Sequence, residues 1–529
     1  MSSLSRRSRP GRGRLPLTIA AVIGVAALLA ACTPGSTTSN TARESSLVIA
    51  ENEVPATFDP VQADNSTVDE VVIPAYNSLL TYDENIELTG ELVDSWTVSE
   101  DGTKIDLTLR DDVTFHDGAP LTADDVVYTL DRISDIGIGV AAFLTAYASS
   151  EAISETEVSI TLSQPDAPFL AALTRVYVLN SALVSEHEGS DSGQSWLASN
   201  DAGSGPYELA EYSANQSARF TQYPDYWGGF DGQAETIEFR YLTEASTQSS
   251  ALTNGDVDIA MDITPREWAT FESNEGFTVD KADSNVVLYV FFNMDDPVTS
   301  NPALREAISH AYDYDQHVES ILVGAGQTVN GVVPAGMQCV ADDLEVPTFD
   351  LDRATQIIDE NGLEGTTVTM TYLEATAEME QAAALLQSNL AEIGVNLELQ
   401  AITYPQYVEL SSKPETRPQL GMIYAFPAFP DTSAILYQNF NSSMIGSQNW
   451  GGYSNPRVDE LTNAAQVTSD QELRCEQYEE VQHLVTDDIA SVNLANAQTV
   501  AVFNDRVQGF KYRSWHHQTV DVYAITLAE

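Results

Sequence analysis

The chain has 529 residues, of which 79 are acidic and 23 are basic, so its formal net charge at pH 7 is −56. This balance excludes nucleic-acid binding through phosphate contacts, which need clustered lysine and arginine side chains. A hydrophobic fraction of 43% excludes a disordered chain, and the length predicts two or three domains. We interpret the acidity mainly as surface solvation, rather than as an attraction for cationic ligands.

The first 31 residues have the pattern of a secretory signal peptide. Five arginines lie between Arg6 and Arg14, an apolar run extends from 15 to 31, and Ala30-Ala31 places small residues directly before Cys32. The run is short for a membrane-spanning helix. Its Leu-Ala-Ala-Cys ending resembles the bacterial lipobox, which implies that Cys32 is diacylated and becomes the mature N-terminus. Two acyl chains make a stable anchor, and residues 32–45 would form a polar tether. The alternative is an ordinary signal peptide with an incidental cysteine.

The first half of the folded region begins with strand signals. The run "LVIA" (47–50) predicts a short buried strand, and residues 95–110 alternate apolar and polar side chains around Asp101-Gly102, which predicts a hairpin. A helix follows from Thr122, because Thr122 and Asp125 have the spacing of a capping box. Its apolar residues fall on one helical face.

The second half adds helices and a β-α-β unit. Asn301-Pro302 and Asn455-Pro456 each predict a helix start, and 470–487 predicts a further helix. A strand at 367–373, a helix at 377–393 and a strand at 395–402 form the β-α-β unit, which requires a parallel or mixed sheet. The predicted class is α/β with mixed sheets.

Two cysteines remain beyond Cys32, namely Cys339 and Cys475. Outside the cytoplasm an even pair predicts one disulfide. Closing a loop of this length contributes roughly 4 kcal/mol in the chain-entropy model, before any strain.

Five segments in order resemble the family 5 extracellular solute-binding proteins of ABC importers. They are residues 57–133, then "GSGPYELAEYSANQSARFTQYPDYWGG" (203–229), "ALTNGDVDIA" (251–260), "FFNMDDPVTSNPALREAISHAYD" (291–313) and "YSNPRVDEL" (453–461). The resemblance covers essentially the whole mature chain and implies a bilobal fold of the periplasmic-binding-protein type (type II, cluster C), with an extra domain.

The resemblance also implies domain limits and partners. Domain I would comprise 46–74, 204–285 and 499–529, domain II 75–203, and domain III 286–498, with the solute held between domains I and III. The expected receptor is a monomer without a cofactor, lipid-anchored at the extracellular face of the cell membrane. It would bind an oligopeptide or small molecule and deliver it to ABC permease subunits that work with a cytoplasmic ATPase.

The ligand residues are inferred from the same resemblance. Peptide receptors of the family hold the ligand's α-amino group with an aspartate, and Ala428 stands at the expected place in "AFPAFPDTSAIL" (425–436). The usual acceptor of the amine is therefore absent, or Asp431 or another acid replaces it. An acid is needed wherever an amine is bound, because burying an ammonium group without a counter-charge is costly.

Aromatic side chains and one arginine complete the candidate site. Tyr424, Phe426 and Phe429 would line the cleft, with ordinary core packing as the alternative, and Trp450 is a further candidate. Arg175 would bind a ligand carboxylate through its planar fork, with a structural ion pair as the alternative.

Other functions remain open on the sequence alone. The histidines lack metal-ligand spacing except for His516-His517, and neighbours in a strand point to opposite faces, so no metal site is predicted. No serine-hydrolase, zinc-protease or cysteine-nucleophile motif occurs, so we expect no enzyme, although paired carboxylates leave an extracellular hydrolase as an alternative. Oligosaccharides, opine-like compounds and nickel chelates are the alternative ligands, and a surface sensor or adhesin is a third reading.

Overall fold

The structure is a computed structural model that describes residues 45–528, apart from residues 84, 335, 375 and 514–518. The predicted signal peptide, Cys32 and the pair His516-His517 lie outside the described residues. Within the described part, no helix has both the length and the apolar character that crossing a membrane would require.

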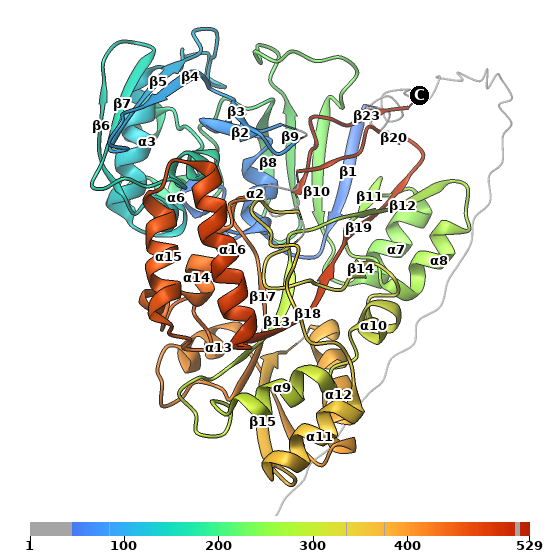
Figure 1. The fold of residues 1–529 in the computed structure, drawn as a ribbon. Helices are drawn as coiled ribbons and strands as arrows, with labels where there is room; N and C mark the ends of the chain where they lie inside the picture. Colours follow the sequence, from blue (N-terminus) through green and yellow to red (C-terminus); the bar gives the residue numbers. More distant parts are fainter. Residues whose placement is uncertain (1–44, 84, 335, 375, 514–518, 529) are drawn as a thin grey trace, which may run out of the picture. The chain divides into compact units, whose positions relative to one another are not determined.

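A seven-stranded mixed sheet, the first sheet, contains the predicted strand 47–50 near its centre (Figure 1). This strand is β1 (Ser46–Glu51), parallel to its neighbours β10 and β11, and the outer strands pair antiparallel. In spatial order the strands are β12 (Phe277–Ala282), β19 (Thr499–Asn504), β11 (Ile259–Ala260), β1, β10 (Thr236–Tyr241), β9 (Ser217–Gln222) and β8 (Tyr207–Ser213). Both faces of β1 are buried, because Val48 and Ala50 pack with α7 (Ala245–Asn254) and α8 (Pro265–Glu272), while Leu47 and Ile49 belong to a larger core on the other face.

The second sheet has six strands and contains the predicted β-α-β unit. In spatial order they are β14 (Gly326–Gln327), β18 (Ser491–Ala497), β13 (Val287–Phe292), β17 (Leu420–Ala425), β15 (Thr367–Leu373) and β16 (Asn396–Ile402). Strand β15 runs parallel to both β16 and β17, and β13 runs antiparallel to its two neighbours. The unit β15–α12–β16 confirms the prediction, with α12 at Ala377–Glu392.

Helices cover both faces of the second sheet (Figure 1). One face packs against α9 (Pro302–Ala311), α11 (Leu351–Asn361) and α12. The other packs against α13 (Tyr404–Ser411), α14 (Ser433–Phe440), α15 (Pro456–Val467) and α16 (Gln471–Asp487). The starts of α9 and α15 at Pro302 and Pro456 confirm the two predicted Asn-Pro helix starts, since Asn301 and Asn455 cap the helices through their side chains.

A four-stranded antiparallel sheet, the third sheet, carries the predicted hairpin. Its order is β4 (Val93–Val98), β5 (Lys104–Leu109), β7 (Glu157–Leu162) and β6 (Tyr147–Ala152). Gly102 turns the hairpin with φ +67°, a conformation that glycine adopts without strain. Helix α3 (Ala123–Ile136) begins with the predicted capping box of Thr122 and Asp125.

The remaining elements are short. In the first half they are η1 (Pro60–Gln62), α2 (Ser66–Val72), β2 (Leu80–Tyr82), β3 (Leu88–Gly90), η2 (Gly139–Phe143), α4 (Phe169–Ala172), η3 (Leu173–Arg175), α5 (Ser181–Glu186) and α6 (Gln194–Leu197). In the second half they are α10 (Tyr314–Gln316), the π-helical turn η4 (His317–Ile321), η5 (Ser442–Met444), β20 (Val507–Gln508), β21 (Tyr512–Arg513), β22 (Thr519–Val520) and β23 (Thr526–Leu527).

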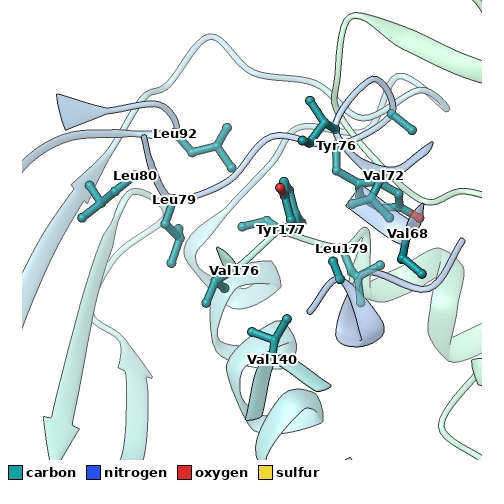
Figure 2. Close-up of a cluster of buried hydrophobic side chains, with 14 of the residues drawn as sticks. Val68, Val72, Tyr76, Leu79, Leu80, Leu92, Val140, Val176, Tyr177 and Leu179 are labelled. Atoms are coloured by element: carbon teal, nitrogen blue, oxygen red, sulfur yellow. The ribbon is translucent and has the colours of Figure 1, made fainter. Parts of the chain in front are cut away.

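One hydrophobic core joins the first sheet to the segment that carries the third sheet. Figure 2 shows buried side chains of α2 and of residues 76–80 beside Val140 of η2 and the stretch 176–179. The core therefore spans the limit predicted between 46–74 and 75–203, and the domain limits stay predictions.

Two connections join the first and second sheets, one between β12 and β13 and one between β18 and β19. They are bonded to each other: Ser284 Oγ donates to the carbonyl of Ala497, and Asn496 Nδ2 donates to the carbonyl of Val286 at 2.7 Å. Because these are the two segments that connect the sheets, a rotation of one sheet relative to the other would have to bend both of them.

Candidate functional site

A cavity of about 580 Å³ lies between segments associated with the three sheets. The residues that line it are Asp64, Asn65, Ser66, Gly139, Ala142, Phe143, Leu373, Tyr404, Ile423, Tyr424, Ala425, Phe426, Ala428, Ala434, Gln438, Asn439, Gln448 and Trp450. We call residues 64–66 the polar wall, and Tyr404, Tyr424, Phe426 and Trp450 together the aromatic wall. The volume falls within the range of small-molecule sites in proteins.

Strand direction explains where the aromatic wall lies. The parallel strands β15, β16 and β17 end at Leu373, Ile402 and Ala425, and cavity-lining residues lie at or just beyond these ends. Ligands of open α/β sheets bind beyond the carboxyl ends of parallel strands. Tyr404 follows β16 at the first position of α13, and Phe426 directly follows β17.

Close packing of η1 and η2 fixes the position of the cavity residues Gly139 and Phe143. Gly139 has φ +60°, and a Cβ atom there would lie 2.1 Å from the carbonyl oxygen of Val61. Only glycine allows this approach, so η2 is held against η1, the element that immediately precedes the polar wall.

Tyr424 lines the cavity as predicted and is held by a carboxylate from α12. Its hydroxyl donates to Glu378 Oε2 at 2.7 Å, and its ring meets that of Phe426 at 5.7 Å with an interplanar angle of 62°. Burial, together with the charge of Glu378, raises the pKa of Tyr424 well above its ordinary value. The side chain is therefore a neutral hydrogen-bond donor at physiological pH.

Phe426 and Tyr404 present open aromatic surface to the cavity, with 56% and 53% of each residue exposed. Phe426 was predicted and Tyr404 was not, although Thr403 and Gln406 form a capping box that marks the start of α13 at the end of a predicted strand. Large exposed aromatic residues in a cavity are typical of ligand contact surfaces.

Trp450 lies in the cavity lining as predicted. The residue is largely buried, and its ring meets that of Tyr407 edge-on at a centroid distance of 5.6 Å. Phe429 does not line the cavity. It is buried and packs edge-on against Phe143 at 5.8 Å, so the core-packing alternative describes this residue, and the prediction of a cleft residue is wrong.

Asp431 corrects a second prediction, because its carboxylate is already paired. Arg474 Nη1 lies 2.5 Å from Asp431 Oδ2 and Nη2 lies 2.8 Å from Oδ1, and both residues are buried outside the cavity lining. Burial by itself raises the pKa of Asp431, but the charge and hydrogen bonds of Arg474 outweigh it and leave the pKa below its ordinary value. A carboxylate engaged in this way is not free to bind a ligand's amine.

Arg175 corrects a third prediction in the same way. It is fully buried, its Nη2 lies 2.6 Å from Asp69 Oδ2, and the same nitrogen donates to the carbonyl of Ala63 at 2.6 Å. It is absent from the cavity lining, so the structural ion pair is the reading that the structure supports. Its bond to Ala63 positions the chain directly before the polar wall.

Ala428 lies in the cavity lining, where it contributes a methyl group and no charge. Asp64, on the polar wall, is the one charged residue among the described residues that line the cavity, and none of those residues is basic. Sequence reasoning missed Asp64, and the only signal near it was the cap residue Asn65, whose side chain accepts from the backbone of Val68.

The described residues contain no group of three or more histidine, cysteine, aspartate and glutamate side chains placed to hold a metal ion. Each described histidine has a protein neighbour. His116 contacts Asp201, His187 stacks on Trp196, His310 contacts the carbonyl of Thr348, His317 contacts Glu378 and His483 contacts Asp343.

Cys339 and Cys475 are joined by a disulfide with Cα atoms 4.7 Å apart. The bond links the segment before α11 to α16, next to Arg474. Thr432 Oγ1 also donates to the carbonyl of Gln338, so the disulfide lies directly behind the loop that follows β17.

Comparison with known proteins gives a consistent result. The family model for bacterial extracellular solute-binding proteins, family 5 Middle, matches residues 87–447. The chain is 28% identical over 484 residues to the probable D,D-dipeptide-binding periplasmic protein of Escherichia coli strain K12, a match that covers 90% of this chain and 93% of that protein.

Two solved structures share the fold. A periplasmic binding protein from Helicobacter pylori, in complex with the peptide STSA, has a TM-score of 0.78 at 21% identity and covers 93% of this chain and 100% of that one. A Campylobacter jejuni protein in complex with Ni(L-His) has a TM-score of 0.78 at 22% identity and covers 91% and 99%. The likeness confirms the predicted α/β fold of periplasmic binding proteins with mixed sheets.

Proposed function

The chain belongs to the bacterial extracellular solute-binding proteins of family 5, and from this premise we propose that it captures peptides or peptide-like solutes for an ABC importer. The observation that carries the proposal is the cavity of about 580 Å³, with aromatic side chains on one wall and polar groups on the other. Peptide-binding relatives support the ligand class, since the Escherichia coli protein is named for D,D-dipeptides and the Helicobacter pylori structure contains a peptide.

The side chains of the cavity fit a ligand with a peptide backbone. Asn65, Gln438, Asn439 and Gln448 offer amide donors and acceptors, and the hydroxyl oxygen of Tyr424, whose proton is donated to Glu378, offers an acceptor. Such groups recognise backbone N–H and C=O whatever the side chains, while aromatic surface stacks on apolar side chains. Closure would bring the two walls together by rotation about the paired connections between the sheets.

We further propose that diacylated Cys32 anchors the receptor at the outer face of the cell membrane. Two chains give stable anchoring, because each buried CH2 contributes about 0.8 kcal/mol. Mass spectrometry of the native N-terminus is expected to find acyl chains on Cys32, and a Cys32→Ala form is expected in the medium. Retention of that form at the membrane would contradict the anchor.

Native mass spectrometry of the purified receptor tests the ligand class, because a closed receptor retains its ligand. We expect a bound mass that fragments as a peptide. A tripeptide-to-pentapeptide library is expected to give heat in isothermal titration and to raise the melting temperature in thermal unfolding. A bound oligosaccharide, opine-like compound or nickel chelate would replace the peptide proposal. Peptide cleavage during incubation would favour a hydrolase instead.

A further inference from the structure

From the charges at the cavity we infer that this site selects ligands with a protonated amine beside an apolar or aromatic body, bound by Asp64, and does not require a ligand carboxylate. The inference rests on the proposed function and specifies its ligand class. It reverses the expectation that the acceptor of the amine lies on the segment after β17, because Ala428 occupies that place and Asp64 comes from the opposite side.

The position of Asp64 is the first support. It is an exposed carboxylate at the start of the polar wall, and its Oδ1 accepts from Asn65 Nδ2 at 3.0 Å, so the second oxygen remains for a ligand. Burial and the charge of Asp64 both raise the pKa of Tyr404, which stands on the aromatic wall. The carboxylate therefore acts across the cavity, within reach of a ligand that contacts Tyr404.

The nearby arginines are the second support, since their charge is used elsewhere. Arg175 lies within the electrostatic field of Asp64 but is paired with Asp69 at 2.6 Å. Arg474 is paired with Asp431, which lies in the loop that leads from Phe426 of the aromatic wall to α14. No described residue of the lining is lysine, arginine or histidine, so the cavity offers a ligand carboxylate no counter-charge.

Glu378 adds negative charge behind the aromatic wall. One oxygen accepts from Tyr424 at 2.7 Å and the other lies 3.2 Å from His317 Nε2. With Asp64 on one side and Glu378 behind the other, the field in the cavity favours a cation and opposes an anion. Tyr404 and Phe426 meanwhile offer ring faces to a cation or to an apolar group.

The peptide Ala-Phe-Ala in three forms tests this inference by isothermal titration. We expect the free and C-terminally amidated forms to bind with similar affinity, and the N-acetylated form to bind roughly tenfold to a hundredfold more weakly, because acetylation removes the charge that Asp64 binds. Loss of affinity on amidation, with N-acetylation tolerated, would overturn the inference and leave peptide binding intact.

Two small probes decide the matter if no form of the peptide binds, an outcome that would count against the proposed function. Ligand-observed NMR would compare phenylalaninamide, a cationic aromatic amine, with 3-phenylpropionate, an anion with a similar ring. Binding of the cation alone supports the inference. Equal binding, preference for the anion, or binding of neither overturns it.

The variant Asp64→Asn isolates the carboxylate, because the amide keeps its size and removes its charge. We expect the variant to bind the amine-bearing probe roughly tenfold or more weakly than the wild type does. Its affinity for the N-acetylated form and its melting temperature should stay near those of the wild type. Asp64→Glu is expected to restore most of the affinity. Asp94→Asn, an exposed aspartate of β4 outside the cavity lining, is the matched control and is expected to have no effect. An Asp64→Asn protein that binds amines as the wild type does would overturn the inference.

Discussion

The two walls of the cavity differ in the side chains that line it but resemble each other in the buried ion pairs of the chain next to them. The polar wall presents Asp64 and two other polar residues, and the aromatic wall presents rings. Behind each wall a buried arginine is paired with an aspartate: Arg175 with Asp69 behind the polar wall, and Arg474 with Asp431 behind the aromatic wall.

The charged groups of this region fall into two kinds: buried ion pairs that join neighbouring segments, and the carboxylate that lines the cavity. Both pairs lie outside the cavity lining, and each connects a wall to a neighbouring segment: Arg175 bonds Ala63, and Arg474 bonds the carbonyl of Ala465 in α15. The pairs therefore hold charge away from the cavity, while the polar and aromatic side chains that line it are Asp64, neutral polar groups and aromatic rings.

The largest expected effect comes from removing the arginine behind the polar wall. Arg175→Met leaves Asp69 in a fully buried place without its arginine, so the free energy of unfolding should fall by about 3–5 kcal/mol in urea titration of the mature chain. Arg219→Met, which breaks the exposed pair with Glu211, is the control and should cost about 0–1 kcal/mol. Equal costs for the two variants would show that the buried pair does not hold the wall.

A smaller loss is expected behind the aromatic wall. Arg474→Met should lower the free energy of unfolding by about 3 kcal/mol, the lower end of the range for breaking a buried pair. Asp431 still accepts from the backbone N–H of Ser433 at 2.9 Å, and its side chain keeps 10% exposure. The exposed pair of Arg353 with Glu306 supplies the control variant, Arg353→Met. A cost larger than that of Arg175→Met would reverse the ranking of the two walls.

These pairs also show what the sequence could and could not predict. Regular elements with strong periodicity were predicted correctly, as in the β15–α12–β16 unit and the hairpin around Gly102, because their signals are local. Arg175 was assigned to the ligand because a charge within an apolar stretch is conspicuous, and Asp431 because it lies close to the place where the family resemblance expects an aspartate. Such a charge is equally a sign of burial, and its partner lies 106 or 43 residues away in the sequence.

The cavity itself was predicted from one side only. Tyr424 and Phe426 lie in or directly beside the segment 425–436, where the family resemblance was read residue by residue, and Trp450 was a separate candidate. The structure places all three in the lining. Asp64 and Tyr404 follow a short 3-10 helix and a strand respectively, and nothing in their local sequence shows that the chain brings them to the same cavity. That meeting depends on the arrangement of the sheets, which no local pattern encodes.

A substitution in the aromatic wall should change ligand affinity, whereas a substitution in the Arg474–Asp431 pair should change stability. Phe426→Ala removes the ring of a residue that is 56% exposed and lines the cavity. The variant should therefore reduce the free energy of solute binding by about 1–2 kcal/mol, roughly fivefold to thirtyfold in Kd, with little change in stability. Isothermal titration measures the affinity. Phe349→Ala, an exposed phenylalanine outside this cavity, is the matched control. Unchanged affinity for Phe426→Ala would remove the ring from the binding surface.

The smallest expected effect comes from a third, part-buried pair, which differs from the other two because its cation is a histidine, whose charge depends on pH. His116 Nδ1 lies 2.7 Å from Asp201. Burial by itself lowers the pKa of His116, but the hydrogen bond and charge of Asp201 outweigh burial and raise the pKa above its ordinary value. A raised pKa in the folded state stabilises the protein below the unfolded value of about 6.5, and this contribution is lost as the pH rises through the folded pKa.

The variant His116→Asn should remove that pH-dependent part of the stability. The difference in the free energy of unfolding between wild type and variant is expected to be larger at pH 5.5 than at pH 8.5. The deficit of Arg474→Met should show no such growth toward low pH, because arginine remains charged throughout and burial favours protonation of Asp431 once its arginine is gone. Urea titrations at the two pH values measure both differences. If the His116→Asn deficit grew with pH, the protonated imidazole would not be the form that Asp201 holds, and the contrast between the titrating pair and the two permanently charged pairs would fail.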